Sequence, residues 1–261
     1  MKKHISILII SLTAISMLTF NSCKKKEDDT TVATPANGTI AFHLHTMVDT
    51  AEVDVLDSVY VMSNHRKISV HFAQMYLSKI QLIKLDGSAV DVPGVIVLKK
   101  QQIEPYILGS VPSGNYQSVR FNVGLTPTEN ASTPLASDST LNTPPMWFGA
   151  TAQPSGYVFV NFQGKIDTTT ACNGTVAQMQ PFSIKIGTNT NLVNTQLNNK
   201  NFTVSPNQTQ YVHLMIDYNM LFMGVNLNNS SNLTMNTVAA NSTASGLQYK
   251  YNISMMFMYE Q

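Results

Sequence analysis

Cysteine is nearly absent from the 261-residue sequence, with Cys23 and Cys172 as the two examples. Small secreted domains that rely on disulfides carry several cysteines at regular spacings, so a disulfide framework is excluded. Charged residues make up 12% of the chain, and 16 Lys and Arg nearly cancel 15 Asp and Glu, for a net charge of +1. A chain with this balance has no bulk field that would attract nucleic acid, and no partner of that class is expected.

Recognisable catalytic signatures are absent as well. The sequence has no nucleophile elbow, phosphate-binding loop, zinc-protease helix or Cys-x-x-Cys pair. Nothing in it places a nucleophile beside a base at a recognisable spacing. We therefore expect a protein that is not an enzyme.

A short apolar segment near the N-terminus predicts an export signal. Two lysines precede the apolar run from Ile5 to Phe20, and small and polar residues then lead to Cys23. The run is shorter than the roughly 20 apolar residues that a membrane-spanning helix needs, so cleavage is favoured over a span. Cys23 stands where the acylated cysteine of a bacterial lipoprotein stands, with plain secretion as the alternative.

These features predict how the chain is divided and where it resides. We expect residues 1–22 to be a lipoprotein signal peptide, and Cys23 to carry a lipid that anchors the protein to the outer membrane of the cell envelope. The sequence leaves open whether the protein is periplasmic or surface-exposed. Residues 23–37 are charged and then rich in Thr, Pro and Ala, as in a flexible tether. Residues 38–261 are assigned to one folded domain.

Alternating apolar and polar residues predict strands along most of this domain. In the segment 39–47, Ile40, Phe42 and Leu44 share one face and two histidines share the other. Similar short stretches recur as far as residues 248–260, and joints rich in Gly, Pro and Asn separate them.

Short strands with such joints are typical of an antiparallel sandwich rather than of alternating βαβ units. The predicted fold class is therefore all-β, with a single antiparallel β-sandwich and long polar loops. Residues 126–146 lack clear periodicity and are expected to form a functional or covering loop. Residues 72–77 fit either a strand or a short helical turn.

Two histidines on the first predicted strand are the leading candidates for metal ligands. His43 and His45 are two residues apart, so their side chains project from the same side of a strand, with Cα atoms about 7 Å apart. Met47 continues this face with a thioether, and imidazole with thioether donors suits copper. The alternative is a polar pair on the solvated face of an antiparallel strand. His71 fits either environment, and His213 is expected on a solvated face.

Six segments occur in an order that is characteristic of one known family. The segments are GTIAFHLHTMVD, FAQMYLSKIQLIKLDG, GNYQSVRFNVGL, PPMWFGATAQPSGYVFVNFQGK, FSIKIG and VHLMIDYNMLF. The most specific are the Met-Trp segment that leads into Gly-Tyr-x-Phe, and Tyr-x-Ser-x-Ile-x-Leu before Asp-Gly. Together they resemble the MbnP-like proteins, a bacterial family associated with copper handling.

The resemblance implies a secreted β-sandwich with a mononuclear copper site, in which a few histidines lie near a tryptophan oxidised to kynurenine. His43 or His45 would supply imidazole, and Trp147 would supply the aromatic residue. His71, Met146 or water would complete the site.

One position departs from the family pattern. The family resemblance leads us to expect a histidine just before the Ile-Gly pair of FSIKIG, where this chain has Lys185. A lysine is charged at neutral pH and replaces imidazole poorly as a copper ligand.

The expected function is copper binding or delivery by an envelope-anchored lipoprotein. Its expected partners are the membrane, through the lipid, and a copper-handling protein. The alternative is a non-catalytic surface binding or structural module that keeps the fold without the metal. The tether and the long polar loops support this second interpretation.

Overall fold

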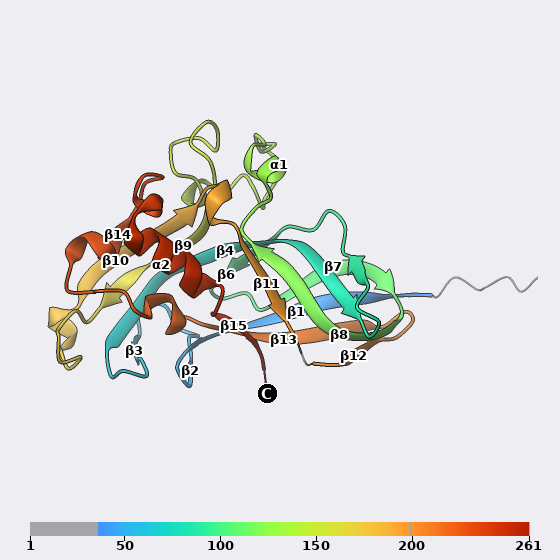
Figure 1. Ribbon diagram of the computed structural model, residues 1–261, viewed down its shortest axis with the longest axis horizontal. Coiled ribbons are helices and arrows are strands. Elements are labelled where there is room, and N and C mark those ends of the chain that lie inside the picture. The colour runs from blue at the N-terminus through green and yellow to red at the C-terminus, as the bar shows by residue number, and fades with distance from the viewer. Residues whose placement is uncertain (1–35, 199, 261) are drawn as a thin grey trace, which may run out of the picture. The chain divides into compact units, whose positions relative to one another are not determined.

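The computed structural model describes residues 36–198 and 200–260, and strands make up most of the regular structure there. In this part of the chain the strands form two sheets, of five and ten strands (Figure 1). The smaller sheet contains β1 (Asn37–Val48), β2 (Ala51–Glu52), β7 (Pro105–Pro112), β13 (Thr209–Asp217) and β15 (Phe257–Tyr259). The larger sheet contains β3 (Val59–Val61), β4 (Lys67–Lys84), β5 (Ala89–Asp91), β6 (Val97–Lys100), β8 (Gly114–Val123), β9 (Val158–Ile166), β10 (Gln180–Gly187), β11 (Val193–Leu197), β12 (Phe202–Val204) and β14 (Thr234–Met235).

The order of the strands gives each sheet a long central member. The larger sheet runs β11-β8-β4-β9-β10-β14, and the short strands β3, β5 and β6 also pair with β4, while β12 pairs with β8. The smaller sheet runs β15-β13-β1-β2, and β7 pairs with the first half of β1. The long strands β1 and β4 therefore each pair with several neighbours at the centre of their sheets.

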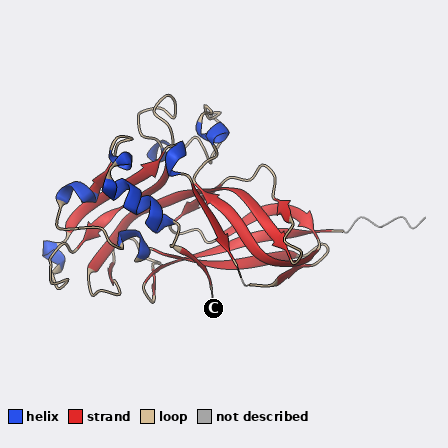
Figure 2. Ribbon diagram, viewed as in Figure 1, coloured by secondary structure: helices blue, strands red, loops and turns tan. Residues whose placement is uncertain are grey.

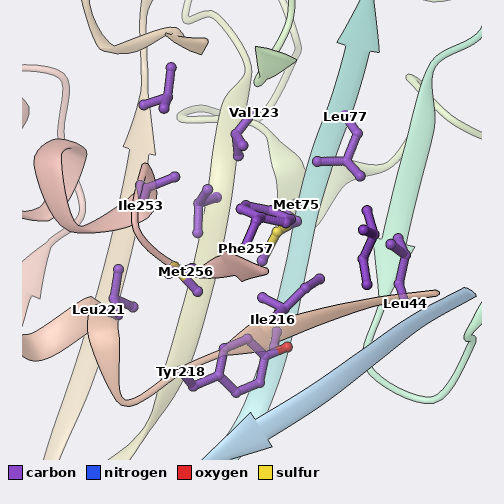
Figure 3. Packing of buried hydrophobic residues seen from close by; sticks show 14 of the residues in the cluster. Leu44, Met75, Leu77, Val123, Ile216, Tyr218, Leu221, Ile253, Met256 and Phe257 are labelled. Carbon is purple, nitrogen blue, oxygen red and sulfur yellow. The ribbon is translucent and has the colours of Figure 1, made fainter. Parts of the chain in front are cut away.

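The main hydrophobic core lies between the two sheets. Figure 3 shows Leu44 of β1 and Ile216 of β13 facing Met75 of β4 and Val123 of β8. Leu44 and Ile216 are fully buried, and Met75 and Val123 are at most 2% exposed. Since residues alternate in facing along a strand, the neighbours of Leu44 project from the outer face of the smaller sheet.

Helical segments occupy the connections (Figure 2). The longest is α2 (Ala244–Ile253), which lies near β10 and β14 in Figure 1. The others are α1 (Pro127–Asn130) and the 3-10 helices η1 (Pro144–Met146), η2 (Val176–Gln178), η3 (Asn189–Asn191), η4 (Met220–Phe222), η5 (Ser230–Leu233) and η6 (Ala240–Ser242). No helix among the described residues is long and apolar enough to cross a membrane.

The predicted all-β sandwich is confirmed, with one difference in how its strands pair. Most pairs are antiparallel, but β1 pairs with β13, and β10 with β14, in the parallel sense. Parallel pairing of an early strand with a late one requires a long connection between them. The alternation within each strand does not reveal which strand it pairs with or in which direction. The candidate site described below lies on the parallel pair β1–β13.

Two local predictions were less accurate. Residues 72–77 lie within β4, so the helical-turn alternative is wrong. The strand predicted over residues 248–260 is wrong up to Ile253, because this part forms α2. Thr243 caps that helix by accepting a hydrogen bond from the Gly246 amide, and Tyr249 and Ile253, one turn apart, are both buried. Helical spacing of the buried residues here overrode the β-prone composition.

The long segment at residues 126–146 covers the outer face of the larger sheet. Its Leu141 and Met146 are buried in a second hydrophobic cluster together with Tyr76 of β4 and Phe159 of β9. Residues on either side of Tyr76 belong to the main core, so this cluster lies on the opposite side of β4. The covering-loop prediction is therefore confirmed.

Candidate metal centre

Strand β1 presents two imidazoles on the outer face of the smaller sheet. His43 and His45 flank the buried Leu44, and their side chains are 25% and 18% exposed. The Nδ1 atom of His43 lies 2.7 Å from the Nε2 atom of His45. The same-face placement predicted from their spacing is what the structure shows.

Strand β13 adds a third imidazole. It runs parallel to β1 in Figure 1, and the pairing places His213 directly beside His43. The ring centroids of these two residues are 4.9 Å apart, and the His213 side chain is 48% exposed. One nitrogen from each of the three histidines lies within 4.8 Å of the others, close enough to hold one metal ion. His43, His45 and His213 are called the histidine cluster below.

The third member was not recognised in the sequence, where His213 was expected on a solvated face. Its side chain is indeed half exposed. The parallel register between β1 and β13 brings it beside His43, and that register comes from tertiary pairing. One sequence signal was available: β13 carries an alternation like that of β1, with His213 flanked by the buried Val212 and Leu214.

Three glutamates from different segments surround the histidine cluster. Glu52 of β2 places Oε1 2.9 Å from His45 Nδ1. Glu104, just before β7, places Oε2 3.4 Å from His43 Nε2 and Oε1 3.7 Å from His45 Nδ1. Glu260, just after β15, places Oε2 3.1 Å from His213 Nδ1 and 3.5 Å from His45 Nε2. The cluster thus combines three nitrogen donors with carboxylate oxygens.

A buried hydrogen-bond network beneath the outer face fixes the segments that carry two of these glutamates. The amide of Gln101, 7% exposed, donates to Thr46 Oγ1 on β1 at 2.8 Å and to the Val53 carbonyl, next to Glu52, at 2.6 Å. Tyr218, just after β13, donates its hydroxyl to Gln101 Oε1 at 2.7 Å. These bonds tie β1, β2, β13 and the turn before β7 together, so the carboxylates are positioned by the interior of the fold.

The backbone of the turn before β7 is fixed too. The Leu44 amide donates to the Glu104 carbonyl at 3.0 Å. The buried Lys99 of β6 donates from Nζ to the Ile103 carbonyl at 2.5 Å. Both bonds hold Glu104 against the middle of β1.

The charges of the cluster give its histidines different proton affinities. Burial lowers the pKa of His43, and the neighbouring His45 lowers it further. Burial acts in the same direction on His45, but its hydrogen bond to Glu52 and the charges of the nearby glutamates outweigh burial and raise the pKa of His45. The hydrogen bond to His45 also lowers the pKa of Glu52. Without metal, His43 therefore favours the neutral form that binds metals, and His45 holds its proton more firmly.

The geometry of the histidine cluster fits a transition metal ion. Two nitrogens bound to one tetrahedral ion at ~2.0–2.1 Å lie roughly 3.3 Å apart. The 2.7 Å between His43 Nδ1 and His45 Nε2 therefore has to widen only slightly, and both rings lie on the partly exposed outer face of the sheet. Neutral imidazole suits copper, zinc and nickel, and the surrounding carboxylates favour a divalent ion.

Two methionine thioethers, those of Met47 and Met215, belong to the strands that carry the histidine cluster. Met47 continues the outer face of β1 and pairs in register with Glu52 and Asp217, and Met215 pairs with His45. Met146, the other thioether considered from the sequence, is fully buried in the second hydrophobic cluster.

His71 lies outside the histidine cluster. It is on β4 of the larger sheet, its side chain is 68% exposed, and its Nδ1 lies 3.0 Å from an oxygen of Asp57. Within residues 36–198 and 200–260 it joins no group of three potential ligands. Cys23 lies outside the described residues.

Trp147 packs on the other side of the sandwich from the histidine cluster. It contacts the second hydrophobic cluster, pairs with Tyr157 through a single β-bridge, and donates from Nε1 to the Leu141 carbonyl at 3.1 Å. The second cluster lies on the outer face of the larger sheet, whereas the histidines lie on the outer face of the smaller one. The structure therefore does not bring Trp147 to His43 and His45.

Lys185 shares the face of Trp147. It lies between the core residues Ile184 and Ile186 of β10, so its side chain projects outward, and it pairs with Asn161, which in turn pairs with Gln74. Asn161 also donates to the Pro145 carbonyl, two residues before Trp147. At the position before Ile-Gly where the family resemblance leads us to expect a histidine, this chain has a lysine in a row with the amides of Asn161 and Gln74.

Comparison with known proteins agrees with this architecture. A family model described as MbnP matches residues 37–239. The chain belongs to the MbnP family. The structure is similar to that of MbnP from Methylosinus trichosporium, with a TM-score of 0.50 and 14% sequence identity over 71% of this chain and 78% of that one. At that identity the similarity shows the shared fold alone. No curated protein matches the chain in sequence.

Proposed function

We propose that this MbnP-family chain is an envelope-anchored lipoprotein that binds copper at the histidine cluster, for storage or delivery. The observation that carries the proposal is the convergence of His43, His45 and His213 from two parallel strands, with one nitrogen of each within 4.8 Å of the others. The three rings and the glutamates around them form one compact set of nitrogen and oxygen donors, as a metal site requires.

Copper is favoured over other ions for two reasons. First, copper is at the top of the stability order for divalent ions with nitrogen donors, so a site of three imidazoles binds it in preference to nickel or zinc at equal availability. Second, the family is associated with copper handling. Two of the rings sit on one strand, so their spacing is set before the metal arrives.

The envelope location rests on the sequence of the N-terminus. The apolar run and Cys23 have the arrangement of a lipoprotein signal. A lipid on Cys23, joined to the domain by the tether, would keep the metal centre at the outer membrane, where a copper-handling protein could exchange the ion. A Cys23→Ala chain should lose metabolic lipid label and leave the membrane fraction. Label retained on that variant would show that Cys23 is not the anchor.

Metal analysis of the full-length chain tests the proposed binding. After equilibrium dialysis against copper, the unchanged chain should retain at least one equivalent, and the triple variant His43→Ala/His45→Ala/His213→Ala should retain none. A His65→Asn chain is the matched control, because His65 lies in a left-handed turn (φ 68°) that Asn adopts readily. Equal copper in the unchanged and triple-variant chains would refute the site.

One observation favours a second function, that of a surface binding module which keeps the fold without the family's metal. On the outer face of the larger sheet, Lys185 stands beside Asn161 at the position just before Ile-Gly where the family resemblance led us to expect a histidine. A chain without copper at either face, but with intact folding, would support this alternative.

A further inference from the structure

We propose that the cluster takes two divalent ions, with the imidazole of His45 joining two adjacent metal positions. The first position is formed with His43 and His213, and the second with Glu52 and Glu104. The inference rests on the proposed function for the first position and adds the second.

The two nitrogens of His45 face different partners. Nε2 lies 2.7 Å from His43 Nδ1, on the side of the histidine cluster. Nδ1 lies 2.9 Å from Glu52 Oε1 and 3.7 Å from Glu104 Oε1. Both sets, His43/His45/His213 and His45/Glu52/Glu104, offer donor atoms within 4.8 Å of one another. Because the ring nitrogens point to opposite sides of the imidazole, one ring can serve both positions at once.

The donors of the second position define which ions it takes. One imidazole nitrogen and two carboxylate oxygens suit zinc or Cu(II) and are a poor match for Cu(I), which prefers softer ligands. Two divalent ions need compensating negative charge, and Glu52, Glu104 and Glu260 all lie within 3.7 Å of a histidine nitrogen of the cluster.

Proton balance follows from the same geometry. When a second ion binds Nδ1 of His45, the proton on that nitrogen leaves to solvent, and the ring becomes a bridging imidazolate. Nothing is oxidised or reduced in this step. The negative charge of the imidazolate adds to that of the glutamates and offsets the second ion.

The second position is built into the fold and does not depend on flexible surface side chains alone. Gln101 bonds to the Val53 carbonyl, next to Glu52, and the Leu44 amide bonds to the Glu104 carbonyl. His45 is 18% exposed and Glu104 31% exposed, and Glu52, at 41%, is the most exposed of the three.

The stoichiometry of the full-length chain decides between one position and two. After dialysis against Zn(II), metal analysis should give two equivalents for the unchanged chain and one for Glu52→Gln/Glu104→Gln. The Asp57→Asn chain is the matched control, because it changes a carboxylate beside His71, a histidine outside the cluster. It should keep two equivalents.

A second measurement needs no variant. Titrated with Cu(II), the unchanged chain should gain an electron paramagnetic resonance signal up to one equivalent and lose most of it by two, because two imidazolate-bridged Cu(II) ions couple magnetically. A signal that grows and then stays constant after one equivalent would overturn the second position. If that single equivalent is lost in His213→Ala but kept in the glutamine variant, the proposed function stands and only this inference fails. Absence of any bound metal would overturn both.

Discussion

The His213→Ala substitution tests whether the third histidine, which comes from β13, contributes to metal binding beyond the pair His43 and His45 on β1. His213 reaches the cluster only through the parallel pairing of β13 with β1. Its side chain is 48% exposed and its one ion-pair partner, Glu260, is 41% exposed. Exposed pairs of this kind contribute about 0–1 kcal/mol to folding. The His213→Ala chain should therefore fold, with a metal-free Tm within about 4 °C of the unchanged chain.

The effect of copper on the Tm of the unchanged chain should exceed the effect of the substitution itself. At free copper 100-fold above Kd, binding stabilises the folded chain by about 2.7 kcal/mol. For a domain of this size, each kcal/mol shifts Tm by about 2–4 °C, so copper should raise Tm by about 5–11 °C. Loss of a residue that only supports a ligand typically weakens metal binding about 10–100-fold, and loss of the ligand itself should cost at least the upper figure. At 100-fold weaker binding the same copper stabilises by about 0.4 kcal/mol, a shift of about 1–2 °C.

Differential scanning fluorimetry of the two chains, with and without copper, measures these shifts directly. The His65→Asn chain, which loses an imidazole outside the cluster, should retain the full shift. A copper-induced shift in His213→Ala equal to that of the unchanged chain would show that β13 contributes no ligand, and the three-histidine site would be refuted.

Three further predictions follow from charges and packing. In metal-free protein, NMR titration of the histidine resonances should give His45 a pKa above 6.5 and His43 a pKa below 6.5. The stability that protonated His45 contributes is then lost as pH rises through its folded-state pKa. Protonation of His43 in the unfolded chain lowers stability as pH falls below 6.5. Burial lowers the pKa of Lys99 from its usual 10.5 to about 8, so the cost of about 3 kcal/mol of burying this charge should fade as pH rises through that window. Urea unfolding should accordingly find Lys99→Met more stable than the unchanged chain at pH 7.5, and the advantage should shrink by pH 10.5. Trp147→Phe should lower stability by about 0.5–1.5 kcal/mol, with no change in copper content, because the Leu141 carbonyl loses one of its two hydrogen bonds and keeps the one from the Thr143 amide.

The sequence predicted those features of the fold that depend on local alternation. The run around Leu44 gave the strand β1, the facing of His43 and His45, and the outer position of both rings, because a period of two fixes which side each residue takes. The family segments located the strands that frame Trp147.

The remaining features depended on long-range pairing. His213 joins the site because β1 and β13 run parallel and in register, a tertiary arrangement that neither strand encodes by itself. The glutamates come from β2, the turn before β7 and the segment after β15, none of which shows a metal-ligand spacing in the sequence. Trp147 was expected near the histidines by family resemblance, but alternation along β4 and β9 puts its cluster on the opposite face.

The most direct test of the metal centre is pulsed electron paramagnetic resonance of the full-length chain loaded with less than one equivalent of Cu(II). The technique detects imidazole nitrogens bound to the ion. Three histidine nitrogens should couple to copper in the unchanged chain, and each of the single variants His43→Ala, His45→Ala and His213→Ala should lose one coupling. A spectrum that is the same in all four chains would contradict the assignment of copper to this cluster.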